Sequence, residues 1–245
     1  MKRPLAFSFA LALVVAPFPA VPPAGAGLPD GDYGDAPENA IAYPAGAVVG
    51  LFPTCLAGPS PFIYHQMATA PNAFFGPTVA YEADGNAGIC PPPPYNRDEC
   101  WRPVDGDAGL ILPDSYTIQA GGVVTCSQGN TCLPAPCTNA AWGADVDIEV
   151  LNQMNATVVV NVLADWNQDG VWSGTANCIA AGAPEWILKN HPVPPGYNGP
   201  ISGLAPPGFL IGPNSGYVWC RFSITEIPIG AANWDGSGVF DRGES

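Results

Sequence analysis

Proline and glycine interrupt this chain too often for long helices. There are 30 prolines and 29 glycines among 245 residues, and no helical apolar period persists beyond a turn or two. A hydrophobic content of 47% with seven tryptophans is nevertheless too high for a disordered chain. The composition therefore predicts one folded domain of short β-strands joined by many loops.

Three segments alternate between apolar and polar residues clearly enough to be strands: 145–151, 157–166 and 217–227. Period-two alternation with one buried face is typical of antiparallel sheets. We therefore expect an all-β, antiparallel two-sheet β-sandwich with long Pro/Gly-rich, disulfide-stapled loops. Residues 152–155 resemble a hairpin connection between the first two strands. Weaker strand candidates are 78–82, 109–112, 116–118 and 123–126, whereas 185–190 fits either a strand or a helical turn.

The first residues resemble a secretory signal peptide. A basic start, Met1-Lys2-Arg3, precedes an apolar stretch over residues 5–18 that is too short to span a membrane. Small residues at Ala24-Gly25-Ala26 fit a cleavage site. We expect a signal peptide at 1–26, a single domain at 27–245, a secreted or cell-surface location, and no membrane insertion after cleavage.

Eight cysteines in an exported chain indicate disulfides, although eight cysteines allow 105 pairings. The expected pairs are Cys90 with Cys100, which bracket a proline run, and Cys178 with Cys220. No C-x-x-C pair occurs, so a zinc site is disfavoured.

The charge excludes some partners. Removing Lys2 and Arg3 with the signal would leave five basic residues against 21 acidic ones, a net charge of −16. Nucleic acid and anionic membranes would be repelled, whereas divalent cations would relieve the self-repulsion. Five of the acids precede glycine, as tight β-turns prefer, so most of these pairs need no ligand.

The most informative motif is Asp165-Trp166-Asn167-Gln168-Asp169-Gly170-Val171-Trp172, directly after a valine-rich strand. Oxygen-bearing side chains at Asp165, Asn167 and Asp169 occupy positions 1, 3 and 5 of a calcium loop. Gly170 stands at position 6, and Val171 would supply a carbonyl oxygen at position 7. Ala176 stands where a helical EF-hand places its bidentate glutamate, so another part of the chain must supply the last carboxylate.

Glu185 and Asp147 are the candidates for that carboxylate. Asp147 belongs to an acidic stripe on the strand that we expect to pair with the one before the loop. The alternatives are a solvent-facing stripe for Asp147 and, for the loop, a turn rich in Asp and Asn that binds nothing. The spacing favours Ca²⁺ as the cofactor.

Three separated motifs are similar to the GEVED-domain family of exported bacterial proteins. The first is Asp32-Tyr33-Gly34-Asp35-Ala36-Pro37-Glu38, followed by Tyr43-Pro44. The second is the end of a strand and the loop after it, Leu163–Trp172. The third is Arg221-Phe222-Ser223-Ile224 together with the closing stretch Gly238–Ser245. The closing motif stops before the family's final acidic pair. The resemblance implies an extracellular β-sandwich module of large surface or secreted proteins, with calcium sites and no established catalysis.

Enzyme functions have less support. His65 and His191 are the only histidines, so a three-histidine metal site is impossible, and no G-x-S-x-G elbow occurs. A glycoside hydrolase needs only two carboxylates, but nothing selects a pair. The sequence thus favours a non-catalytic structural or adhesive module that binds calcium and contacts surface glycans or other extracellular proteins. The alternative is a carbohydrate-binding module with Tyr217, Trp219 and Arg221 as its platform.

Overall fold

The computed structural model describes residues 28–57, 61–85, 109–112, 116–119, 123–126 and 135–245. Within these ranges the regular elements are β-strands, apart from the short 3-10 helices η1 (Pro44–Gly46) and η3 (Ile201–Leu204). The expectation of an all-β chain is confirmed. No helix in the described part of the chain is long and apolar enough to cross a membrane.

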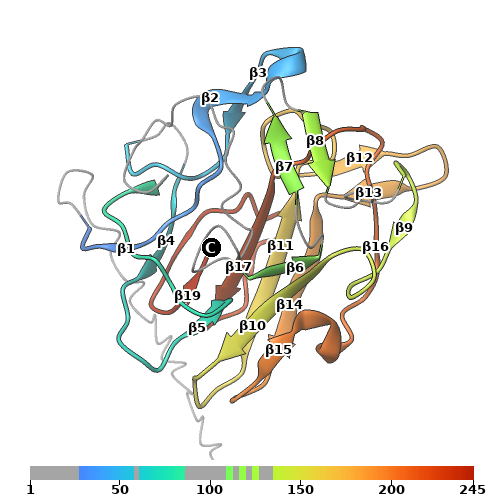
Figure 1. The fold of residues 1–245 in the computed structure, drawn as a ribbon. Helices are drawn as coiled ribbons and strands as arrows, with labels where there is room; N and C mark the ends of the chain where they lie inside the picture. Colours follow the sequence, from blue (N-terminus) through green and yellow to red (C-terminus); the bar gives the residue numbers. More distant parts are fainter. Residues whose placement is uncertain (1–27, 58–60, 86–108, 113–115, 120–122, 127–134) are drawn as a thin grey trace, which may run out of the picture.

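The centre of the molecule is a four-stranded antiparallel sheet in the order β14-β11-β17-β19. A second sheet, in the order β15-β10-β5 with β6 also pairing β10, lies across a shared core (Figure 1). The strands are β5 (Ala73–Phe75), β6 (Leu110–Leu112), β10 (Asp147–Asn152), β11 (Val158–Ala164), β14 (Trp186–Val193), β15 (Asn198–Pro200), β17 (Cys220–Thr225) and β19 (Gly243–Glu244). Valines on β11 and apolar residues on β10 and β5 fill the space between the sheets, as in a β-sandwich.

The opposite face of the central sheet is also covered. A mainly N-terminal layer packs there. It consists of the hairpin β2 (Glu38–Tyr43)–β3 (Val48–Leu51) and the sheet β1 (Gly31–Asp32)–β4 (Ile63–Gln66)–β18 (Gly238–Phe240), whose last strand comes from residues 238–240. β18 pairs with β4 in parallel, an exception to the antiparallel rule. The remaining pairs are β7 (Tyr116–Gln119) with β8 (Val123–Cys126), β9 (Asn139–Ala140) with β16 (Phe209–Leu210), and β12 (Thr175–Asn177) with β13 (Gly182–Pro184).

The two coverings explain why β11 is buried along its whole length. Val158, Val160 and Val162 point into the sandwich core, whereas Leu163 packs into the second core. Asn161, also fully buried, satisfies its amide by accepting from Trp186 Nε1 (3.1 Å) and the Asn190 backbone N–H (2.8 Å). A buried polar residue in a central strand is tolerated because its hydrogen bonds are made.

The predicted hairpin between the 145–151 and 157–166 strands is wrong. β10 pairs with β15, β5 and β6, while β11 pairs with β14 and β17, so the two strands belong to opposite sheets. Both carry an apolar face, and these faces meet across the core instead of lying side by side. The connection is held by Asn152, whose Nδ2 donates to the carbonyls of Ala156, Val193 and Pro194.

Most of the shorter strand candidates are confirmed: β6, β7 and β8 overlap 109–112, 116–118 and 123–126. Of the two interpretations of 185–190, the strand holds, because residues 186–190 belong to β14. The candidate 78–82 is wrong, because only Glu82 there makes a bridge, to Gly31. The strand in this region is instead β5, whose three residues are all buried and too few to show alternation.

The predicted pair of Cys178 with Cys220 is also wrong. Cys178 is bonded to Cys137, and Cys220 is a free thiol. The proposed Cys90–Cys100 pair lies outside the described residues, as do the signal peptide and the proline run at 91–94. Cys55 is disulfide-bonded as well. The disulfides indicate an oxidising compartment, consistent with an extracellular location.

Candidate metal centre

The candidate loop begins where β11 ends. β11 and β14 pair with Leu163 opposite Trp186, and the Ala164 N–H donates to the Glu185 carbonyl (2.8 Å). This register places Glu185, the residue before β14, next to Asp165, the residue after β11. Neither side chain is accessible to solvent, and each is 0% exposed. Of the two carboxylates proposed to complete the shell, the structure therefore brings Glu185 to the loop.

Asp147 does not reach the loop. It lies on β10 in the facing sheet, where its Oδ2 accepts from Ser202 Oγ (2.6 Å) and its Oδ1 from the Ser202 N–H (3.1 Å). Asp147 thus fixes the first turn of η3 through two hydrogen bonds to Ser202. Its candidacy rested on the hairpin between β10 and β11, and it fails together with that hairpin.

Within the loop, side-chain oxygens accept from the backbone N–H groups that follow them. Asp165 accepts from Asp169 N–H (3.2 Å) and Gly170 N–H (2.9 Å). Asn167 Oδ1 accepts from Asp169 N–H (2.9 Å), and Asp169 Oδ1 accepts from Val171 N–H (3.1 Å). These contacts curl the backbone so that the side chains at positions 1, 3 and 5 share one side of the turn. They also match a turn that binds nothing, so the turn geometry alone does not decide between the two interpretations.

Gly170 is required by the geometry of this turn. Its φ is +89°, a left-handed conformation that glycine adopts without strain. A Cβ atom there would lie 2.5 Å from the Val49 carbonyl oxygen, and the Gly170 carbonyl accepts from the Leu51 N–H (2.7 Å). The loop is thereby attached to β3, in the N-terminal layer that covers the central sheet.

Burial and mutual repulsion disfavour charge on the two carboxylates. Burial, with a contribution from Asp169, raises the pKa of Asp165 to about 6, although the Gly170 N–H opposes the shift. Burial and the neighbouring Asp165 raise the pKa of Glu185 to about 7. The polar groups around them are backbone N–H donors, including Ser173 to Glu185 Oε2 (3.0 Å), and the Tyr43 hydroxyl at Asp165. No basic side chain is among their described partners.

Asn167 and Asp169 are exposed, so the site combines two exposed oxygen-bearing side chains with two buried ones. Asn167 Nδ2 donates to Asp169 Oδ2 (2.8 Å). In this arrangement, no three His, Cys, Asp or Glu side chains of the described residues are grouped closely enough to hold a metal ion. A metal here would also need the Asn167 amide and the Val171 carbonyl, together with a rotation of the two exposed side chains.

The residues proposed as a sugar platform do not form one. The Tyr217 and Trp219 rings are 6.2 Å apart at 81°, not coplanar, and both are half-buried. Their polar atoms donate to the Ala42 carbonyl, Trp219 Nε1 at 2.9 Å. Arg221 is only 4% exposed. All three face the N-terminal layer, which supplies the covering that the strand pattern alone did not reveal.

Arg221 and His65 organise buried polar clusters that the sequence did not reveal. Arg221 Nη1 donates to the Pro53 carbonyl (2.6 Å) and the Gly236 carbonyl (2.8 Å), and its guanidinium lies 4.6 Å from the Trp172 ring centroid. His65 Nδ1 lies 3.1 Å from the Arg242 carbonyl, which accepts only if Nδ1 carries the proton. Burial lowers the pKa of His65 to about 3, so it is neutral near pH 7 and ties the 242–245 segment to β4.

Comparison with known proteins found no matching family model, no matching curated protein and no matching solved structure. The site must therefore be interpreted from its own chemistry.

Proposed function

We propose that this protein is a non-catalytic, extracellular β-sandwich module that binds Ca²⁺ at the loop Asp165–Val171, with Glu185 completing the shell. Its role is structural or adhesive, in a secreted or cell-surface protein. The similarity of the three motifs to GEVED domains, the export-type start of the chain and the disulfide-bonded β-sandwich support the extracellular part.

The observation that carries the calcium proposal is the pair of fully buried carboxylates, Asp165 and Glu185, at the end of β11. Burying a carboxylate without a compensating charge is costly, and bringing a second one beside it adds repulsion. A divalent cation would offset both costs, because it would be the largest local charge at the site. Glu185 accepts hydrogen bonds from Asn167 N–H (3.4 Å) and Ser173 N–H (3.0 Å), so a second carboxylate is held at the loop beside Asp165.

The donor set suits a hard cation. Asp165, Asn167, Asp169, the Val171 carbonyl and Glu185 supply only oxygen, which Ca²⁺ prefers at six to eight positions. Bidentate carboxylates or water would fill the remainder. The N–H donors do not block the site, since a carboxylate oxygen has lone pairs for both a hydrogen bond and a metal. Calcium would also stabilise the contact between Gly170 and β3, and so the attachment of the N-terminal layer.

Calcium should raise the melting temperature of the full chain. Binding to the native state alone contributes about 2.7 kcal/mol at a calcium concentration of 100 times Kd. For a chain of this size that corresponds to roughly 5–10 °C. Extracellular modules bind at about 10⁻⁴–10⁻³ M, so melts in EDTA and in millimolar CaCl₂ cover the useful range.

The matched variants are Asp165→Asn, at the loop, and Asp235→Asn, at another Asp-Gly turn. Asp165→Asn should abolish the calcium-dependent rise, and Asp235→Asn should keep it. An equal rise in the wild type and in Asp165→Asn would place the metal elsewhere and contradict the proposal.

The calcium effect should depend on pH. Because the pKa values of Asp165 and Glu185 are raised to about 6 and 7, the folded protein binds protons more tightly than the unfolded chain does. The contribution of these groups to stability without calcium is therefore present at pH 4 and lost as the pH rises through 6–7. Calcium must displace these protons, so its stabilisation should be full at pH 8 and small at pH 5. Melts with and without calcium at both pH values check this, and an equal calcium shift at the two would be inconsistent with it.

A further inference from the structure

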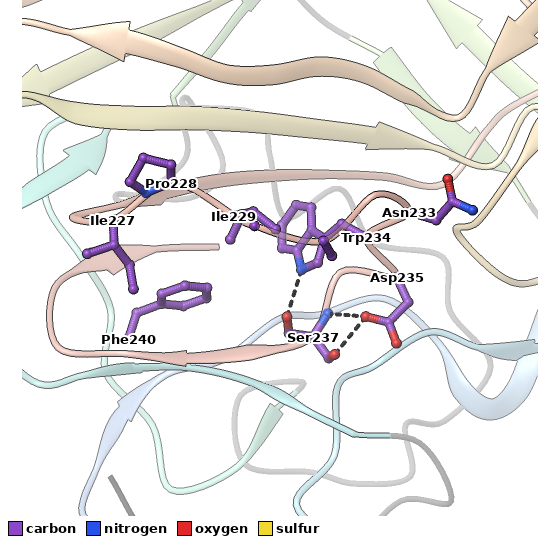
Figure 2. Close-up of a pocket in the computed structure, with 10 residues that line it drawn as sticks. Ile227, Pro228, Ile229, Asn233, Trp234, Asp235, Ser237 and Phe240 are labelled. Carbon is purple, nitrogen blue, oxygen red and sulfur yellow. Dashed lines mark hydrogen bonds between the residues drawn. The ribbon is translucent and has the colours of Figure 1, made fainter. Parts of the chain in front are cut away.

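The loop between β17 and β18 lines a hollow of about 500 Å³ that is open to solvent. We call it the 227–240 hollow. Figure 2 shows its two ends. At one end Ile227 and Pro228 lie opposite Phe240; at the other lie the polar side chains of Asn233 and Asp235. The hollow is thus apolar at one end and acidic at the other.

The loop that forms the hollow is fixed from behind. Asn190 Oδ1 accepts from the Ile229 N–H (2.8 Å), and Asn190 Nδ2 donates to the Ile229 carbonyl (3.0 Å). Trp234 Nε1 donates to the Ser237 carbonyl (2.7 Å), and its ring packs 5.8 Å from that of Trp186. A hollow with a fixed wall pays little ordering cost when it is filled.

The charge around the hollow is negative. Asp235 uses Oδ1 to accept from both the N–H (3.0 Å) and the hydroxyl (2.6 Å) of Ser237, and Oδ2 has no recorded hydrogen bond within the described chain. Glu226 and Asp241 adjoin the apolar end in sequence, with Arg242 as the accompanying cation. The buried Arg221 lies behind Gly236, where its charge offsets part of the negative charge of Asp235. With a net charge of −14 for the whole chain, a cationic occupant is favoured over an anionic one.

Sugar rings fit this hollow poorly. They stack on exposed aromatic faces, but Trp234 is only 4% exposed and Phe240 only 6%. The accessible apolar side chain that lines the hollow is aliphatic instead: Ile227 is 54% exposed. Aliphatic walls that lead to a single carboxylate match the side chains of lysine and arginine, which pack a hydrocarbon stem and keep a charged end near water.

We propose that the 227–240 hollow is a docking site for a segment of a partner protein that carries lysine or arginine between apolar residues. The stem of the basic side chain lies along Ile227 and Pro228, its charged end reaches Asp235, and a neighbouring apolar residue covers the exposed side of Ile227. This surface is separate from the calcium loop and does not depend on calcium binding there.

The probe is a fluorescein-labelled short peptide of alternating leucine and lysine, with glutamine and glutamate versions as matched controls. Fluorescence anisotropy with the full chain should show tightest binding for the lysine peptide, weakening as salt is added. Asp235→Asn should weaken the lysine peptide about two- to fivefold, as expected for a surface ion pair, and leave the glutamine peptide unchanged. Ile227→Ser should weaken both peptides.

The control variant is Ile179→Ser, at the fully exposed turn between β12 and β13, which should change nothing. Melting curves identify any variant that fails to fold. Asp235→Asn changes an exposed carboxylate and is therefore a more conservative substitution than Ile227→Ser. Equal binding of the lysine and glutamine peptides, or no effect of Asp235→Asn, would overturn the proposal. A concentration-dependent dimer that Ile227→Ser abolishes would assign the hollow to a second copy of the chain and overturn it as well.

Discussion

Replacing Arg221 with leucine should lower the free energy of unfolding by about 3–5 kcal/mol, the range measured when one member of a buried charged cluster is removed. Leucine would leave the carbonyls of Pro53 and Gly236 and the hydroxyl of Thr54 without their donor. It would also remove the positive charge that faces the acidic residues Asp32, Asp35, Glu38 and Asp235. Urea unfolding followed by tryptophan fluorescence measures the loss.

Arg221→Lys is the control that separates charge from geometry. Lysine keeps the positive charge but cannot reproduce the planar fork that reaches two carbonyls and lies against Trp172. It should recover only part of the lost stability. If Arg221→Leu unfolds at the same urea concentration as the wild type, the guanidinium is not the tie between the central sheet and the N-terminal layer.

Removing the Cys137–Cys178 disulfide should cost roughly 4 kcal/mol, from the chain-entropy relation for a loop of about this length. The two cysteines are 41 positions apart in sequence. Cys137 lies just before β9 and Cys178 just after β12, so the loop that they close contains β10, β11 and the candidate loop at Asp165. The test variant is Cys137→Ser with Cys178→Ser, unfolded in urea under non-reducing conditions.

Cys220→Ser is the matched control, because the Cys220 thiol forms no disulfide and its hydrogen bond is a long one, to the Val218 carbonyl at 3.8 Å. It should change stability by less than about 1 kcal/mol. Non-reducing peptide mapping of the wild type gives an independent check. Recovery of Cys178 joined to Cys220 would contradict the structure and restore the pairing expected from sequence.

Two strands of the central sheet, β11 and β17, could be predicted because their pattern is local, whereas the β14 segment fits either a strand or a helical turn and β19 was not predicted. The valine alternation in β11 and the alternation around Phe222 and Ile224 in β17 need no knowledge of partners. The Asp165 loop was likewise visible, because its oxygens are spaced within one turn. From the sequence, Glu185 was only one of two candidate carboxylates. The pairing register of β11 with β14 places Glu185 beside Asp165, and this register depends on the tertiary structure.

The errors about Asp147, the Cys178–Cys220 pair and the Tyr217–Trp219 platform have one physical cause. The alternation within a strand does not determine which other segments pack against it. Asp147 was assigned to the metal because β10 and β11 are adjacent in sequence, yet they face each other across the core. Cys220 points toward the core, as alternation predicts, but Cys178 is bonded to Cys137. Tyr217 and Trp219 occupy the polar face of their segment, and only the fold shows that the β2–β3 hairpin covers it.

The central claim is that one calcium ion binds at the Asp165 loop. Isothermal titration of the full, calcium-stripped chain with CaCl₂ at pH 8 tests it most directly, with Asp165→Asn plus Asp169→Asn as the comparison. The account predicts that the wild type binds one more Ca²⁺ per chain than the double variant, at millimolar affinity or tighter. Identical titrations of the two proteins would contradict it.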